Sequence, residues 1–223
     1  MHSNKKIAII NYGVGNLFSV KQACETFGMT GVITSSPEMI ETCDAVILPG
    51  VGAFGSAMQS LEKNCLVPVI KKAAYSGKPF LGICLGMQLL LEKSHEFGLF
   101  DGLGIIKGEV IRFKQDKGPS QKMLRIPHIG WNRIEPPLNR TWNNSYLKTV
   151  PARSFMYFVH SYYAVPDDPD IILSNTIYGE QKFCSSFQYE NILGCQFHPE
   201  KSGSIGLEIY KTLASELDSH GSI

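Results

Sequence analysis

The chain has 223 residues, of which 43% are hydrophobic and 18% charged, and its formal net charge is +1. These values suit one globular domain over residues 1–223 and argue against a nucleic-acid partner, which would need a basic face. No apolar run reaches the roughly 18 residues that span a membrane, and residues 1–6 lead into a short apolar run unlike a secretory signal, so we expect a cytoplasmic protein.

Short apolar segments alternate with helical patterns through the first half of the chain. The predicted strands are residues 7–10, 31–34, 45–48 and 79–83. The predicted helices are residues 18–27, 55–65, 66–76 and 85–93. Continuous apolar strands that alternate with helices are typical of a parallel sheet covered on both faces.

The second half of the chain changes character. Its predicted strands are residues 105–113, 133–134, 156–160, 171–178, 183–189 and 192–197. A helix is predicted over residues 203–217, and loops over residues 116–121 and 136–145. Strands without intervening helices indicate antiparallel pairing. The predicted fold class is therefore α/β: a mostly parallel central sheet flanked by helices, with antiparallel strands added in the second half.

The strongest chemical motif is Gly82-Ile83-Cys84-Leu85-Gly86, where the predicted strand meets the next helix. Glycines two residues before and after a nucleophile let the chain turn sharply, which is the pattern of a nucleophile elbow. The following helix N-terminus favours the thiolate, and the N–H of Leu85 would point at the reacting carbonyl. The motif predicts that Cys84 is a catalytic nucleophile.

The other interpretation of Cys84 is a buried structural thiol, which is common for cysteine inside proteins. The chain has six cysteines but no CxxC pair, and it is large enough to fold without disulfides. The elbow pattern favours the catalytic interpretation for Cys84.

A cysteine nucleophile of this kind needs a histidine base and a group that orients it. Of six histidines, His198 has an acid in a telling position, in His198-Pro199-Glu200. Pro199 biases His198 towards extended backbone, in which residues two apart point to the same side, so Glu200 would lie beside the imidazole. Alone, this tripeptide would indicate a surface turn. A zinc site of Cys84, His198 and Glu200 matches no common ligand spacing.

These motifs resemble class-I, triad-type glutamine amidotransferases. Four further segments resemble the glutaminase subunits of imidazole glycerol phosphate synthase, an enzyme of histidine biosynthesis; they are residues 10–17, 48–54, 126–132 and 157–163. The likeness extends over about residues 7–213. It implies a flavodoxin-like fold, hydrolysis of glutamine to glutamate and ammonia through a thioester, and no cofactor or metal.

The resemblance implies a role for each matching residue. Cys84 attacks the amide carbon of glutamine, His198 passes a proton to the leaving ammonia, and Glu200 orients His198. The oxyanion hole is formed by Val51, Gly52 and Leu85. The residues implied in substrate binding are Gln88, Glu96, His160, Ser161 and Tyr162; read without the resemblance, these five are ordinary helix-surface and strand residues.

The resemblance also implies a partner, a (β/α)8 synthase subunit that forms a heterodimer with this chain and receives its ammonia. Segment 127–132 contains a tryptophan, and an exposed tryptophan is a typical interface anchor. The expected interface residues are Pro127, His128, Gly130, Trp131, Asn132 and Lys201.

Two departures from the family pattern leave the partner open. The family often has Asp where this chain has Asn11, and residues 136–154 match its usual sequence poorly. A sister group of glutaminases supplies ammonia for amidating sugars of bacterial surface polysaccharides. That role is the alternative function.

Three other classes of function are weaker. Nucleotide binding would rest on Gly13 and Gly15, but a dinucleotide fingerprint needs a third glycine where this chain has Phe18. A catalytically inactive binding module conflicts with the intact set Cys84, His198 and Glu200. A cysteine hydrolase or protease on the same scaffold would be separated by testing glutamine against peptide and acyl substrates.

Overall fold

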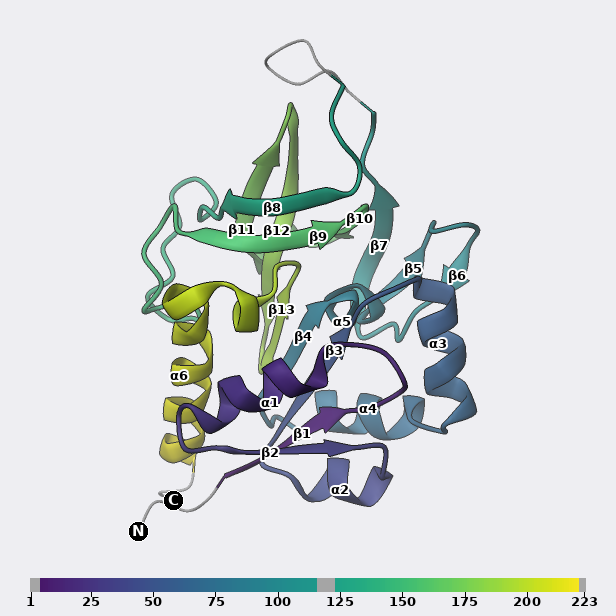
Figure 1. The fold of residues 1–223 in the computed structure, drawn as a ribbon, viewed down its shortest axis with the longest axis vertical. Helices are drawn as coiled ribbons and strands as arrows, with labels where there is room; N and C mark the ends of the chain where they lie inside the picture. The colour runs from purple at the N-terminus through teal and green to yellow at the C-terminus, as the bar shows by residue number, and fades with distance from the viewer. Residues whose placement is uncertain (1–4, 116–122, 221–223) are drawn as a thin grey trace.

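The computed structural model describes residues 5–115 and 123–220, so the predicted loop 116–121 lies outside the described residues. Its main sheet contains β1 (Lys6–Ile10), β2 (Thr30–Thr34), β3 (Ala45–Gly50), β4 (Phe80–Cys84), β11 (Ile172–Tyr178), β12 (Gln181–Tyr189) and β13 (Ile192–Cys195). The strand order is β11-β12-β13-β4-β3-β1-β2 (Figure 1). The strands from β13 to β2 are parallel, whereas β11 and β12 are antiparallel. The predicted fold class is confirmed.

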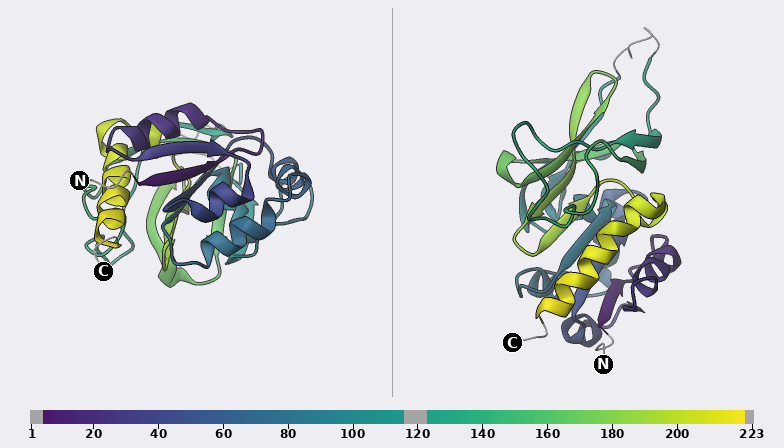
Figure 2. Two further views of the ribbon diagram at one scale, coloured as in Figure 1. Left: turned by 90° about the horizontal axis from the view of Figure 1, so that it is seen from below. Right: turned by 90° about the vertical axis from the view of Figure 1, so that its left-hand side faces the viewer.

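Helices cover both faces of this sheet (Figures 1 and 2). They are α1 (Leu17–Glu25), α2 (Pro37–Thr42), α3 (Phe54–Lys63), α4 (Val67–Ala74), α5 (Leu85–Leu89) and α6 (Gly203–His220). Because side chains alternate along a strand, Ile7 and Ile9 pack with α1 and α6, whereas Ala8 and Ile10 pack with α2, α3 and α4. The central strands are apolar throughout because both faces are buried.

Two smaller sheets complete the fold. One contains β5 (Leu91–Ser94), β6 (Phe100–Asp101), β7 (Ile106–Arg112) and β10 (Tyr162–Pro166). The other pairs β8 (His128–Arg133) with β9 (Phe155–His160), and in Figure 1 this pair crosses in front of β11 and β12. Short 3₁₀ turns, η1 (Pro169–Ile171) and η2 (Pro199–Lys201), precede β11 and α6. Among the described residues, no helix is both long and apolar enough to cross a membrane.

Two predicted elements differ from the structure, and α2, β6 and β10 were not predicted. The predicted helix 85–93 is wrong in its second part: α5 ends at Leu89, and Leu91 begins β5 and pairs with Ile106 of β7. An apolar run is compatible with either helix or strand, and here the pairing with β7 decides. The strand predicted at 133–134 is longer, from His128 to Arg133.

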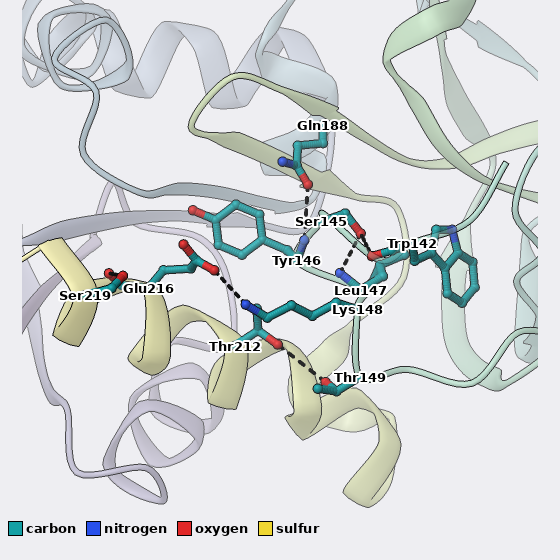
Figure 3. A network of polar contacts seen from close by, with 10 residues as sticks. All are labelled: Trp142, Ser145, Tyr146, Leu147, Lys148, Thr149, Gln188, Thr212, Glu216 and Ser219. Carbon is teal, nitrogen blue, oxygen red and sulfur yellow. Dashed lines mark hydrogen bonds and ion pairs between the residues drawn. The ribbon is translucent and has the colours of Figure 1, made fainter.

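Residues 136–154, which match the family pattern poorly, pack firmly against the rest of the chain (Figure 3). Trp142 is buried and donates its indole N–H to the Leu173 carbonyl at 2.7 Å. Lys148 forms an ion pair with Glu216 of α6, with Nζ 2.7 Å from Oε1. The segment therefore forms an integral part of the fold.

Candidate active site

Cys84 lies at a sharp turn from β4 into α5. Its backbone has φ 54° and ψ −110°, a strained conformation for a residue with a side chain. A Cβ on Gly86 would lie 1.7 Å from the Leu48 carbonyl oxygen, and one on Gly82 would lie 3.0 Å from the Gly86 oxygen. The two glycines of the motif are therefore required by close backbone approach. They let the turn present the thiol at the carboxyl edge of the sheet.

His198 and Glu200 meet in a tight turn just after β13. His198 Nδ1 lies 2.9 Å from Glu200 Oε1, and both side chains are almost completely buried. His198 has extended backbone, as predicted, but Pro199 begins the η2 turn, so the turn and not a continued strand brings the two side chains together. Ser202 fixes the turn by donating its hydroxyl to the His198 carbonyl at 2.6 Å.

The pKa of His198 results from opposing effects. Burial disfavours the charged ring and lowers the pKa, but attraction and hydrogen bonding to Cys84, followed by those to Glu200, outweigh burial and raise it to about 10. Nε2 of His198 is buried and has no partner of ordinary hydrogen-bond geometry in the described part of the chain. Cys84 is nonetheless close enough to raise the pKa of the ring. Such contacts are often loose before substrate binds.

A cavity of about 180 Å³ opens in front of the thiol. It is lined by Val51, Gly52, Cys84, Leu85, Gln88, Glu96, Val159, His160, Ser161 and Tyr162. This set contains every residue predicted for the oxyanion hole and for substrate binding. His198 and Glu200 are not part of the lining; they lie behind the thiol.

Two polar side chains of the cavity wall, those of Gln88 and Glu96, already have partners in the protein. Gln88 donates its amide N–H groups to the Tyr162 carbonyl at 2.9 Å and to Gln196 Oε1 at 3.0 Å, so its own oxygen remains for a ligand. Glu96 accepts from the N–H of Phe54, at the start of α3, at 2.6 Å. Burial raises the pKa of the Glu96 carboxyl, and this hydrogen bond opposes the shift.

The two glycines at the end of β3 and in the loop that follows are required for different reasons. Gly50 pairs with Cys84 across β3 and β4, and a Cβ on it would lie 2.4 Å from the Tyr12 hydroxyl. Gly52 has φ +103° and nothing within 4 Å of a Cβ position, so conformation and not crowding requires glycine there. Val51 is exposed between them.

The predicted interface segment alternates between buried and exposed residues because it lies in strand β8. Ile129, Trp131 and Arg133 are exposed, whereas His128 is 3% exposed. The ring of His128 is therefore inside the protein and not on the outer face of β8, where a partner would dock. Ile129, omitted from the prediction, is 60% exposed on the outer face. Lys201 and Pro127 are exposed, and Gly130 and Asn132 are partly buried.

One polar residue of the site was not predicted. Gln196 is completely buried, and its amide nitrogen lies 3.7 Å from the Cys84 sulfur. Gln196 lies just after β13, two residues before His198, and this spacing in extended backbone is the sequence signal that would have pointed to it. Among the described residues, no cluster of three or more His, Cys, Asp or Glu side chains has metal-binding geometry.

The elbow, the buried His–Glu pair and the cavity agree with a family comparison. The model of the family "glutamine amidotransferase class-I" matches residues 8–212, and the chain belongs to this family. Two relatives narrow the comparison. Imidazole glycerol phosphate synthase subunit HisH 1 of Legionella pneumophila (strain Lens) is 46% identical over 204 residues, covering 91% of this chain and 95% of the relative. The HisH subunit of Geobacter sulfurreducens is 43% identical over 210 residues, covering 92% and 96%. Within the class-I family, the chain belongs with these HisH subunits.

Solved structures share the fold at low sequence identity. The structure of PurLQS from Thermotoga maritima superposes with a TM-score of 0.67 at 17% identity, covering 96% of this chain and all of that chain. A glutamine amidotransferase from the same organism gives a TM-score of 0.56 at 18% identity, covering 100% and 87%. These similarities support the fold assignment alone.

Proposed function

We propose that this chain hydrolyses L-glutamine with the triad Cys84, His198 and Glu200, and that the ammonia passes to a synthase subunit in histidine biosynthesis. The observation that carries the proposal is the strained turn at Cys84, which presents the thiol to a cavity of about 180 Å³ beside a buried His–Glu pair. A cysteine on such a turn, with a histidine that is itself oriented, is the arrangement of nucleophilic catalysis.

The proposed chemistry proceeds in two steps. The Cys84 thiolate attacks the side-chain amide carbon of glutamine, the C–N bond breaks, and the proton held by His198 leaves with ammonia. Water then attacks the thioester while His198 accepts its proton, and glutamate departs as Cys84 is restored. Glu200 holds Nδ1 of His198, which keeps Nε2 directed at the reacting atoms.

The walls of the cavity have the groups that this reaction needs. Leu85, in the first turn of α5, and the loop residues Val51 and Gly52 line the cavity, so the N–H of Leu85 and an N–H of the loop, once turned inward, would stabilise a tetrahedral oxyanion. Glu96 has a carboxylate suited to the α-ammonium of glutamine. Backbone groups of Ser161 and Tyr162 line the opposite wall, where the α-carboxylate would bind.

The proposed partner is a (β/α)8 synthase subunit, forming a heterodimer in the cytoplasm. The outer face of β8, with Ile129 and Trp131 more than half exposed, is an apolar surface suited to such an interface, and Lys201 adds an exposed cation. The HisH relatives support imidazole glycerol phosphate synthase as the complex. They do not support the sugar-amidation alternative.

The test is Cys84→Ser. We expect loss of glutamine-dependent turnover by at least about 1,000-fold, because a serine hydroxyl is a far weaker nucleophile than a thiolate at neutral pH. Ammonia-dependent synthesis by the partner subunit should continue, because free ammonia bypasses the thioester. Glutamine-dependent turnover of the serine variant near the wild-type rate would refute the proposal.

A further inference from the structure

A continuous line of hydrogen bonds joins the partner-facing strand β8 to the thiol. Asn132 Nδ2 lies 3.3 Å from His128 Nε2, and His128 Nδ1 lies 3.1 Å from His160 Nε2. His160 Nδ1 lies 2.9 Å from the Tyr162 carbonyl oxygen. That oxygen also accepts from Gln88, which continues to Gln196 and the Cys84 sulfur.

The chemistry of the end groups fixes the direction of every donor in this line. A carbonyl oxygen only accepts, so His160 must have its proton on Nδ1 and must accept at Nε2. His128 must then donate from Nδ1 and accept at Nε2. The donor to His128 is the Asn132 amide, whose other N–H donates to the Ile177 carbonyl at 2.9 Å. In each hydrogen bond from Asn132 to the Tyr162 carbonyl, only one of the two atoms can be the donor.

The surroundings keep both rings neutral and in place. His128 lies between the rings of Phe158 and Tyr178, with centroids 5.0 and 4.0 Å away, and Phe113 packs against both histidines. Burial lowers the pKa of His128 to about 4. For His160 burial is also the main cause, and its pKa is lowered to about 3. Each ring therefore has a single proton near neutral pH, as the polarity argument requires.

We infer that Asn132, His128 and His160 are positioning residues that hold the Tyr162 carbonyl, and through it Gln88 and the wall of the glutamine cavity, in the geometry for substrate binding. This inference rests on the proposed glutaminase function. It gives His128 a role that its buried position allows, in place of docking. It also connects the proposed partner surface with the substrate site, because Asn132 lies in the same strand as Trp131.

The sharpest variant is Asn132→Asp, which is nearly isosteric but removes the donor to His128 and reverses the required polarity. The matched control is Asn191→Asp. Asn191 also donates its amide to two carbonyls, Ala74 O at 2.9 Å and Lys78 O at 2.7 Å, but it lies next to the opposite end of β4 from Cys84. Both substitutions remove amide hydrogen bonds to backbone carbonyls, but only Asn132→Asp interrupts the line of hydrogen bonds that leads to Cys84.

A second pair of variants separates donation from packing. His128→Asn keeps an N–H that can reach His160, whereas His128→Leu has a similar volume and no donor. Neither substitution alters the exposed face of β8, so docking of the partner is preserved in both.

The experiment measures glutamine hydrolysis at pH 8 by the complex with the cognate synthase subunit, added to saturation, with ammonia-dependent synthesis and thermal unfolding in parallel. We expect Asn132→Asp and His128→Leu to raise the KM for glutamine by about tenfold, with kcat changed less than about threefold, while Asn191→Asp and His128→Asn stay within about threefold in KM. A KM of Asn132→Asp equal to that of Asn191→Asp, or equal losses in His128→Asn and His128→Leu, would overturn the inference. A wild-type complex without glutamine hydrolysis would instead refute the proposed function.

Discussion

Cysteine has very different environments at its six positions in this chain. Burial raises the pKa of Cys43, Cys184 and Cys195, and of Cys24 to about 12, so these thiols are poor nucleophiles near neutral pH. Cys65 is exposed but lies outside the cavity. Cys84 alone lies where a ligand and a histidine meet, so its reactivity should depend on ligand shape.

An electrophilic analogue of glutamine should therefore modify Cys84 and leave the other five cysteines unmodified. A small unselective reagent such as iodoacetamide should also modify the exposed Cys65. Peptide mapping by mass spectrometry distinguishes the sites, and Cys65→Ser is the control, since it should keep its labelling by the analogue. Analogue found on Cys24, Cys43, Cys65, Cys184 or Cys195 would contradict the expectation.

The buried histidine pair should make the fold sensitive to acid. In the unfolded chain a histidine has a pKa near 6.5, whereas burial lowers it to about 4 for His128 and about 3 for His160. As pH falls below about 6.5, the unfolded chain binds protons that the folded chain cannot. Stability therefore falls with pH, by about 1.4 kcal/mol per pH unit for each histidine, until the folded rings protonate.

When the pH is lowered from 7 to 5, we expect His128 and His160 together to lower the free energy of unfolding of the wild type by about 4 kcal/mol. The decrease in His128→Asn should be about 2 kcal/mol smaller, because only His160 contributes. Urea unfolding at the two pH values measures the difference. An equal loss in wild type and His128→Asn would show that His128 does not resist protonation in the folded protein.

At the scale of elements, strand β8 shows how one segment serves two purposes. Its period of two directs His128 and Asn132 towards the protein and Ile129, Trp131 and Arg133 outward. The inner residues connect with the cavity, and the outer residues form the proposed docking surface. Substitutions on the two faces should therefore have separable effects.

Trp131→Ala should weaken binding of the synthase subunit by roughly 30-fold, as expected for loss of an aromatic anchor worth about 2 kcal/mol. The fold should be unaffected, because Trp131 is 55% exposed. Titration of the synthase by calorimetry gives the dissociation constant. Leu138→Ala, which removes another exposed apolar side chain from a different segment, should bind as wild type; equal weakening in both variants would count against β8 as the docking surface.

Sequence reasoning predicted the elements whose pattern has one physical cause. The parallel strands are apolar because both faces are buried, and the glycines around Cys84 reflect a close approach that their spacing revealed. Helix α2 was missed although its signals were present: Ser36 caps Met39 N–H, and Pro37 is in the first turn. The end of α5 could not be predicted, because pairing of Leu91 with Ile106 is a long-range contact.

In the candidate site, too, local sequence patterns indicated some residues, whereas long-range contacts could not be predicted. Cys84, His198 and Glu200 were proposed from spacing alone, since the elbow and the His-Pro-Glu sequence are local features, and the structure brings His198 and Glu200 into contact. The orientation of His128 depended on assigning segment 127–132 to a strand and applying its alternation, which the prediction did not do. The hydrogen bonds of Gln88 and Gln196 join residues 108 positions apart, so no local pattern could indicate them.

At the scale of the whole molecule, the loop proposed to form the oxyanion hole joins two fixed points. Gly50 is held within the sheet against Tyr12, and α3 is held at its start by Glu96. Between them, the peptide joining Val51 and Gly52 has room to rotate, because Gly52 tolerates positive φ and meets no neighbour. We therefore expect a synthase docked on the outer face of β8 to change the population of peptide orientations without disturbing the core.

A glutaminase without an ammonia acceptor wastes glutamine, so we expect the isolated chain to be slow because the Val51–Gly52 peptide aims no N–H at the oxyanion. Adding the synthase subunit with its acceptor bound should raise glutamate release by roughly 100- to 1,000-fold, the value of one oxyanion donor. Gly52→Ala provides the control within the loop. A side chain there strains φ +103° and should reduce activation by the synthase, while binding of the synthase, measured separately, stays unchanged.

An isolated chain that already hydrolyses glutamine at the rate of the complex would show that the loop needs no partner. Activation only by a sugar-amidating enzyme would leave the glutaminase chemistry intact and transfer it to the other pathway.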